Sequence, residues 1–186
     1  MTSAPFDTVS VISDSVPIHG CHVSEGARVL GLPLPRSYVQ FVSRFGYGLF
    51  GGLIHIFPWA PGYGDDITLR SQEIRTMFAW TLDLEIAELE PDGSREQLLR
   101  SVPFGISING DTLCWDPESK VAGEPEVVVV ASKVLAFRRS NASLAPFLTG
   151  LSNRESARIL WGANTRPIPA TFTPSRFFDD WHRGGA

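Results

Sequence analysis

Two histidines and a cysteine lie together near the start of the chain, in the sequence His19-Gly20-Cys21-His22. Imidazole and thiolate are ligands that zinc prefers, but a zinc site needs three or four converging ligands, and no second cluster follows to complete one. Cys21 and His22 are neighbours in sequence, a spacing that rarely gives a thiol and an imidazole the geometry of nucleophilic catalysis. We therefore predict no metal site, no cofactor and no catalytic residue in this segment.

Asp111 and Asp116 could be read as a carboxylate pair for general acid–base chemistry. They lie in the stretch 102–116, where Asn109-Gly110 separates two apolar runs. This pattern predicts a β-hairpin closed by a type I′ turn, which needs positive φ at both central residues. An Asp directly after a turn glycine more often hydrogen-bonds to its own backbone and shapes the turn. We therefore interpret both carboxylates as part of the architecture.

The charges of the chain are unevenly distributed. The segment 83–132 has eleven acidic and three basic residues, whereas the segment 133–186 has eight basic and three acidic ones. An acidic run of this kind is usually solvated surface, but it is also able to dock a basic partner, because complementary charge speeds encounter and sets register. Under that second interpretation the partner-binding residues are Asp83, Glu85, Glu88, Glu90, Asp92 and Glu96.

Composition limits the other classes of partner. With 43% hydrophobic and 19% charged residues in 186, the chain is typical of a globular domain. Charged residues interrupt every apolar run, and the N-terminus lacks the basic and apolar regions of a secretory signal, so we expect no membrane association. Two widely separated cysteines suit the cytoplasm. The basic C-terminal part has no cluster of Lys and Arg interleaved with aromatic residues, so we expect no nucleic acid partner.

The order of predicted elements favours an α+β fold, with an antiparallel sheet packed with N-terminal and C-terminal helices. We divide the chain into an N-terminal arm (1–23), an α+β domain (24–163) and a Pro-rich C-terminal extension (164–186). Helices are predicted over 24–31, 35–45, 143–150 and 153–161, and a further one from Asp65 or Asp66 past Trp80, with Ile67, Ile74, Met77 and Phe78 on one face. Strands are predicted over 49–59 with a bulge at Gly51-Gly52, on both sides of Asn109-Gly110, over 126–131 and over 134–138. A polar loop is predicted over 117–125.

Two motifs in this order resemble the SUKH superfamily. The first is Leu30-Gly31, Leu34-Pro35, Tyr38 and Phe41, followed by Gly46. The second, in 103–116, reads Pro-Phe-Gly before the turn and Gly-Asp-x-Leu-Cys-Trp-Asp after it. The valine strand and the helix at 143–148 follow in the expected order, so the resemblance covers about residues 24–151. The usual Asn-Gly-Gly after the second helix is replaced here by the sequence at 45–48.

The resemblance implies a function as well as a fold. The SUKH superfamily holds bacterial immunity proteins against polymorphic toxins and fungal regulators of cell-wall synthesis. The resemblance implies a module without enzymatic activity, which binds and neutralises a toxin domain, often a nuclease. We expect such a toxin to carry a basic surface, because it acts on nucleic acid. The alternative is a regulatory or scaffold module that binds an endogenous protein. A third reading, a metal-dependent enzyme using His19, Cys21 and His22, has the least support.

Overall fold

The computed structural model of the chain describes residues 5–13, 18–89, 91–161 and 166–175. Its strands are β1 (Ser10–Val11), β2 (Arg28–Val29), β3 (Leu32–Pro33), β4 (Gly48–Phe50), β5 (Ile54–Ile56), β6 (Val102–Ser107), β7 (Thr112–Val121), β8 (Glu124–Val130), β9 (Phe137–Arg139) and β10 (Thr171–Pro174). Its helices are α1 (Arg36–Phe45), α2 (Ile67–Asp83), α3 (Arg95–Arg100), α4 (Leu144–Gly150) and α5 (Arg154–Trp161), with a 3₁₀ turn, η1 (Ser132–Val134).

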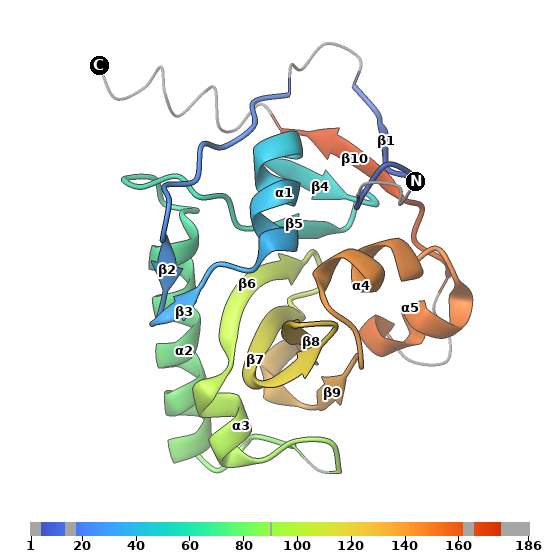
Figure 1. Cartoon of the computed structure of the whole chain (residues 1–186). Helices are drawn as coiled ribbons and strands as arrows, with labels where there is room; N and C mark the ends of the chain where they lie inside the picture. The colour runs from blue at the N-terminus through green and yellow to red at the C-terminus, as the bar shows by residue number, and fades with distance from the viewer. Residues whose placement is uncertain (1–4, 14–17, 90, 162–165, 176–186) are drawn as a thin grey trace.

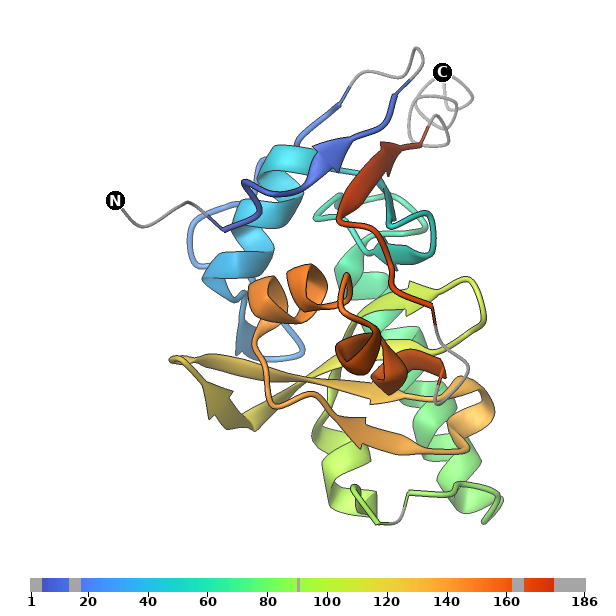
Figure 2. The ribbon, with the colours of Figure 1, turned by 90° about the vertical axis from the view of Figure 1, so that its right-hand side faces the viewer.

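Eight strands form one sheet in the order β1-β10-β4-β5-β6-β7-β8-β9, and β2 and β3 form a separate two-stranded ladder. All neighbours in the large sheet are antiparallel except β1 and β10. Helices α1 and α4 lie on one side of the sheet and α2 lies on the other, along β6 (Figures 1 and 2). This arrangement confirms the predicted α+β class. None of the described helices has the length and apolar composition needed to cross a membrane.

Helix α1 agrees with its prediction and contributes its buried face to the core. Pro35 precedes it, and Gly46 ends it with a φ of 65°, a conformation that favours glycine. Phe41 and Phe45 on its buried face pack against Phe172 of β10, with ring centroids 5.9 and 5.1 Å apart. The described parts of both terminal segments thus join the sheet, β1 from the arm at 1–23 and β10 from the extension at 164–186.

The predicted helix over 24–31 is wrong. The chain instead reverses between β2 and β3 through Leu30 and Gly31, whose φ values are 47° and 84°. The side chain of Arg28 closes this turn by donating from Nη1 to the carbonyl of Gly31 at 2.7 Å. A window this short, with Gly26 inside it and Gly31 at its end, cannot offset the unfavourable nucleation of a helix.

Two further predictions, a single strand over 49–59 and a loop over 117–125, are wrong because the structure has a tight turn within each segment. The predicted single strand over 49–59 is a hairpin, because Gly51 and Gly52 both have positive φ, 59° and 69°. The predicted polar loop over 117–125 is a long extension of β7 and β8, which reverses at Ala122-Gly123 with φ of 52° and 84°. In each case a pair of residues in the left-handed region turns the chain tightly, and the flanking residues can then pair.

The hairpin between β6 and β7 is confirmed, but its type I′ turn is wrong. Only Gly110, with a φ of 89°, is left-handed, and Asn109 is not. The amide of Gly110 donates to the carbonyl of Ser107 at 2.9 Å, and the amide of Ser107 donates to the carbonyl of Asp111 at 2.8 Å. This is the pattern of a three-residue loop, a tight turn followed by a left-handed glycine.

The remaining elements largely follow their predictions. Asp66 caps α2 by accepting from the amide of Thr68 at 2.8 Å, the valines of β8 are fully buried, and β9 pairs beside them. Helices α4 and α5 occupy the predicted ranges, whereas α3 was not predicted. Met77 is 42% exposed and does not share the buried face of α2. Successive helical residues are rotated by about 100°, which turns Met77 away from Phe78.

Candidate functional site

The sequence-predicted acidic residues begin at the C-terminal end of α2. Asp83, the last residue of the helix, forms an exposed ion pair with Arg95 of α3 at 3.0 Å. Glu85 and Glu88 are exposed, and neither forms an ion pair with another described residue. The amide of Glu88 donates to the carbonyl of Val134 at 2.9 Å, which ties the segment after α2 to η1. This end of the molecule therefore presents negative charge on a backbone fixed by hydrogen bonds.

The helix end that carries Glu85 is a Schellman motif. The amide of Glu85 donates to the carbonyl of Leu82 at 3.1 Å, and the amide of Ile86 donates to the carbonyl of Thr81 at 3.4 Å. Glu85 occupies the position where helices usually place a glycine, and its φ is 55°. A carboxylate thus stands in a strained conformation beside the negative end of the helix dipole.

We expect the variant Glu85→Gly to raise the free energy of unfolding by about 0.5 kcal/mol. Relief of the left-handed strain, about 1–2 kcal/mol, exceeds the extra backbone entropy of an unfolded glycine, about 0.5–1 kcal/mol. The matched control is Glu85→Ala, which removes the same charge but keeps the strain. Urea denaturation should rank Glu85→Gly above Glu85→Ala, and equal stability of the two would contradict the assigned strain.

The other predicted acidic residues have different surroundings. Glu96 lies in the first turn of α3, where its carboxylate accepts from the Oγ of the N-cap Ser94 at 2.8 Å. Its backbone amide and that hydroxyl hold the pKa of Glu96 below the usual range. Asp92 lines a cavity together with Arg138, Arg139 and residues of α4 and α5. Glu90 lies outside the described residues. The structure therefore places Asp83, Glu85 and Glu88 at the C-terminal end of α2, with Asp83 paired to Arg95 of α3, whereas Asp92 borders a cavity.

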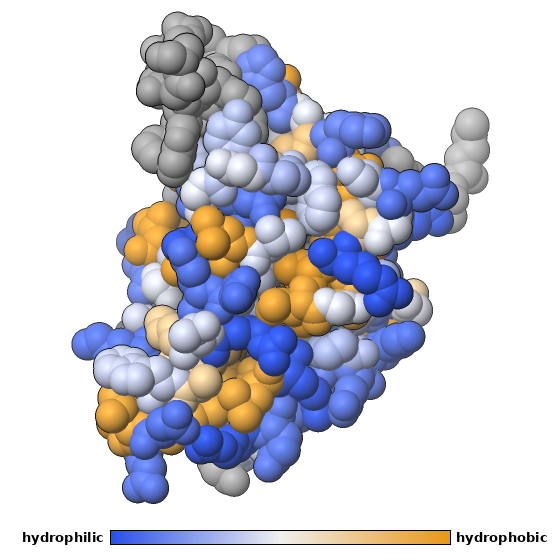
Figure 3. All heavy atoms as spheres, turned by 90° about the vertical axis from the view of Figure 1, so that its left-hand side faces the viewer, coloured by the Kyte–Doolittle hydropathy of each residue, from blue (hydrophilic) through white to orange (hydrophobic). Residues whose placement is uncertain are grey.

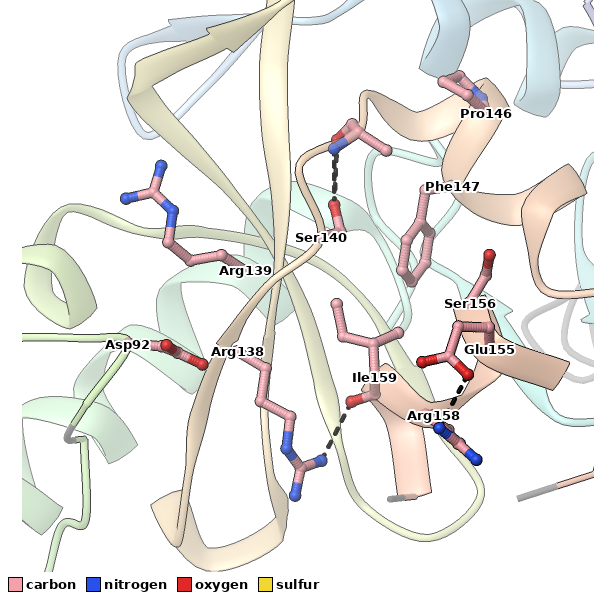
Figure 4. Close-up of a pocket in the computed structure, with 11 residues that line it drawn as sticks. Asp92, Arg138, Arg139, Ser140, Pro146, Phe147, Glu155, Ser156, Arg158 and Ile159 are labelled. Carbon is pink, nitrogen blue, oxygen red and sulfur yellow. Dashed lines mark hydrogen bonds and ion pairs between the residues drawn. The ribbon is translucent and has the colours of Figure 1, made fainter. Parts of the chain in front are cut away.

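The cavity that Asp92 lines has a volume of about 400 Å³ and lies between β9, α4 and α5 (Figure 4). Three arginines border it, but each is already engaged. Arg138 donates to the carbonyls of Ile159 and Leu160 at 3.1 and 2.9 Å, and Arg158 pairs with Glu155 at 2.8 Å. The third, Arg139, points away from Arg138 and is paired with Glu126 (Figure 4). These side chains do not converge on a common point, so the cavity does not define an anion site.

Asp111 and Asp116 both serve the architecture, as predicted. The carboxylate of Asp111 accepts from the Oγ of Ser107 at 2.9 Å and from the amide of Ser132 at 3.2 Å, and so it joins two turns. Asp116 is 1% exposed and accepts from the Nε and Nη2 of Arg100, both at 2.9 Å. Burial would raise the pKa of Asp116, but these bonds outweigh it and hold the pKa below the usual range.

Cys21 in the His19-Cys21-His22 segment is buried and lies beside Trp59. Burial raises the pKa of its thiol to about 11, so Cys21 is a thiol at neutral pH. Both histidines are exposed and border, with Cys21, a cavity of about 240 Å³. Among the described ranges no group of three His, Cys, Asp or Glu side chains has the geometry to hold a metal ion.

A cluster of polar and aromatic residues around His55 was missed by sequence reasoning. His55 of β5 packs edge-on against Tyr47, with centroids 4.5 Å apart, and Tyr47 donates from its hydroxyl to Asp65 at 2.7 Å. Arg70 lies 3.8 Å from the same carboxylate. These residues come from four separate segments, so no spacing in the sequence indicates them. Burial lowers the pKa of His55; the negative charge of Asp65 raises this pKa, and the positive charge of Arg70 lowers it further.

This lowered pKa predicts a pH-dependent stability. In the unfolded chain His55 takes up a proton near pH 6.5, whereas in the folded protein it stays neutral to lower pH. The free energy of unfolding should therefore fall as pH decreases below about 6.5, by up to about 1.4 kcal/mol per pH unit. Denaturation of the wild type and of His55→Gln at pH 5–7 measures this slope. A slope that survives the substitution would show that another group is responsible.

Comparisons of the chain with protein-family models, with curated proteins and with solved structures gave no match. The fold defines an α+β protein with a mostly antiparallel sheet.

Proposed function

We propose that this chain is a non-enzymatic, cytoplasmic protein-binding module of the SUKH type. Its role would be that of an immunity protein, which neutralises a toxin domain with a basic surface, such as a nuclease, by binding to it directly. The observation that carries this proposal is the exposed acidic end of α2, where Glu85 and Glu88 have no basic counterpart among the described residues. A toxin that acts on nucleic acid needs positive charge, and an acidic surface is complementary to it.

The positions that carry the SUKH resemblance are consistent with this proposal. Tyr38 of the first motif and Trp115 of the second meet in the core, with their rings edge-on and 5.3 Å between centroids. Both side chains are completely buried. The two motifs therefore support one shared core, which is the expected behaviour of residues that define a fold. They do not include the exposed end of α2.

The direct test is co-expression of the tagged chain with the product of the neighbouring gene. We expect the two proteins to co-purify and the chain to restore growth that the neighbouring product inhibits. Absence of both effects would contradict the immunity proposal. Co-purification with an endogenous protein that does not inhibit growth would favour the regulatory alternative instead.

Charge reversal tests the acidic surface within this proposal. We expect the triple variant Glu85→Lys, Glu88→Lys and Glu90→Lys to weaken binding of the neighbouring product by about 30-fold, since each lost exposed ion pair is worth about 0.2–1 kcal/mol and reversal adds repulsion. The control is Glu25→Lys, which reverses an exposed charge elsewhere. Isothermal titration calorimetry measures both. Equal affinities of the triple variant and the control would show that the acidic run is ordinary surface.

A further inference from the structure

Four large apolar side chains stand exposed at the end of α2 that carries the acidic residues. They are Met77 (42%), Trp80 (61%), Leu84 (48%) and Ile86 (53%), and we name them the α2 apolar patch. The first three are spaced three and four residues apart, which places them on one side of the helix. In the view of this side of the molecule, hydrophobic side chains gather near the lower end, where α2 ends, beside hydrophilic ones (Figure 3).

The patch is separate from the face of α2 that holds the fold together. Ile74, Phe78 and Leu82 fill the core side of the helix, and Ser71 bonds to the carbonyl of Pro103 in β6 at 2.5 Å. The helix therefore carries apolar residues on two sides, of which only one is covered within the described chain. Exposed patches of large apolar residues bordered by polar ones typically mark interaction sites.

The backbone holds the patch in a defined shape. The two hydrogen bonds of the Schellman motif fold Ile86 back against the last turn of α2, and the bond from Glu88 to Val134 fixes the segment that follows. A surface that is already ordered loses little entropy on binding, which favours affinity. Trp80, the largest and most exposed of the four, is of a residue type that often dominates the binding energy of interfaces.

The charges at its border restrict what can cover the patch. Asp83 is paired with Arg95, which leaves Glu85 and Glu88 as acidic residues at the border that form no ion pair with another described residue. A second copy of this chain would bring like charges together, and an anionic lipid surface would be repelled. A partner with Lys or Arg around an apolar centre would bury the patch and pair with its border.

We propose that the α2 apolar patch is the centre of a docking surface for a basic protein, which presents an apolar depression ringed by Lys and Arg. Trp80 fills that depression, and Glu85 and Glu88 contact the ring. This inference rests on the proposed function in taking the partner to be a protein, but it does not require that the partner be a toxin.

Photo-crosslinking in the cells that naturally produce the protein tests the surface directly. Trp80 is replaced in the full chain by the crosslinking residue p-benzoylphenylalanine, and the captured peptides are identified by mass spectrometry. The matched control carries the same residue at Ile108, which is 63% exposed in the β6–β7 turn. We expect position 80, and not position 108, to capture a protein with a basic surface. Capture of a second copy or of lipid, or equal capture at both positions, would overturn the proposal.

Affinity measurements with the captured protein complete the test. We expect Trp80→Ser to weaken its binding by at least about 30-fold and Ile108→Ser by less than about 2-fold. Both side chains are exposed, so thermal unfolding should confirm that the variants stay folded. Equal affinities of the two variants would overturn the proposal. If the captured protein binds through Trp80 but does not inhibit growth, the docking surface stands and the immunity function fails.

Discussion

Replacing Trp115 with alanine is expected to lower the free energy of unfolding by about 4 kcal/mol, as is typical of a large buried aromatic side chain. The indole is completely buried, stacked on Phe104 with centroids 4.3 Å apart and packed edge-on against Tyr38. Its removal would leave a cavity where β6, β7 and α1 meet. Urea denaturation followed by circular dichroism measures the loss.

The variant Trp115→Phe is the informative control. The Nε1 of Trp115 is buried and has no hydrogen-bond partner among the residues that the structure describes. An unsatisfied buried donor costs about 1–3 kcal/mol, and phenylalanine lacks that donor. We therefore expect Trp115→Phe to be destabilised by less than about 1.5 kcal/mol, because the lost donor offsets part of the lost packing. A loss as large as that of Trp115→Ala would indicate that the indole nitrogen has a partner.

Replacing Arg100 with methionine is expected to destabilise the protein by about 3 kcal/mol at neutral pH. The substitution keeps an apolar stem but leaves Asp116, which is 1% exposed, as an uncompensated buried carboxylate. Asp116 also faces Glu126 across β7 and β8, so two like charges would lie opposite each other, with Arg139 as the basic residue paired with Glu126. Chemical denaturation at neutral pH measures the effect.

The pH dependence of Arg100→Met separates lost charge pairing from lost packing. Without Arg100, burial should raise the pKa of Asp116 above its value in the unfolded chain. The folded variant would then retain a proton that the unfolded chain releases, so the destabilisation should grow as pH rises from about 4 to 7. Adding Asp116→Asn removes the buried charge and should recover part of the stability. A loss independent of pH would mean that packing of the Arg100 stem dominates.

Local sequence patterns were sufficient to predict several helices and strands. The helix α1 follows from its apolar spacing between Pro35 and Gly46, and β8 follows from a run of valines that only a buried strand accommodates. The β6–β7 hairpin follows from Asn109-Gly110, although its turn type does not. That difference arises because Ser107 pairs with Asp111, which lengthens the loop by one residue.

Other features depend on partners far away in the chain. Strand β10 lies between β1 and β4, whose residues are more than a hundred positions earlier. Four segments meet at His55, and Arg100 reaches Asp116 sixteen residues away. Such contacts are set by sheet order and side-chain packing, which no local spacing encodes.

The candidate site likewise combines features set by the local sequence with features set by long-range packing. The sequence alone determined that the region after position 83 is acidic and that a helix precedes it, because charge and periodicity are local properties. Only the tertiary structure decided which side of α2 faces the core, and so left Met77, Trp80 and Leu84 exposed beside Glu85 and Glu88. The physical reason is that α2 has apolar residues on two sides, and β6 covers only one of them.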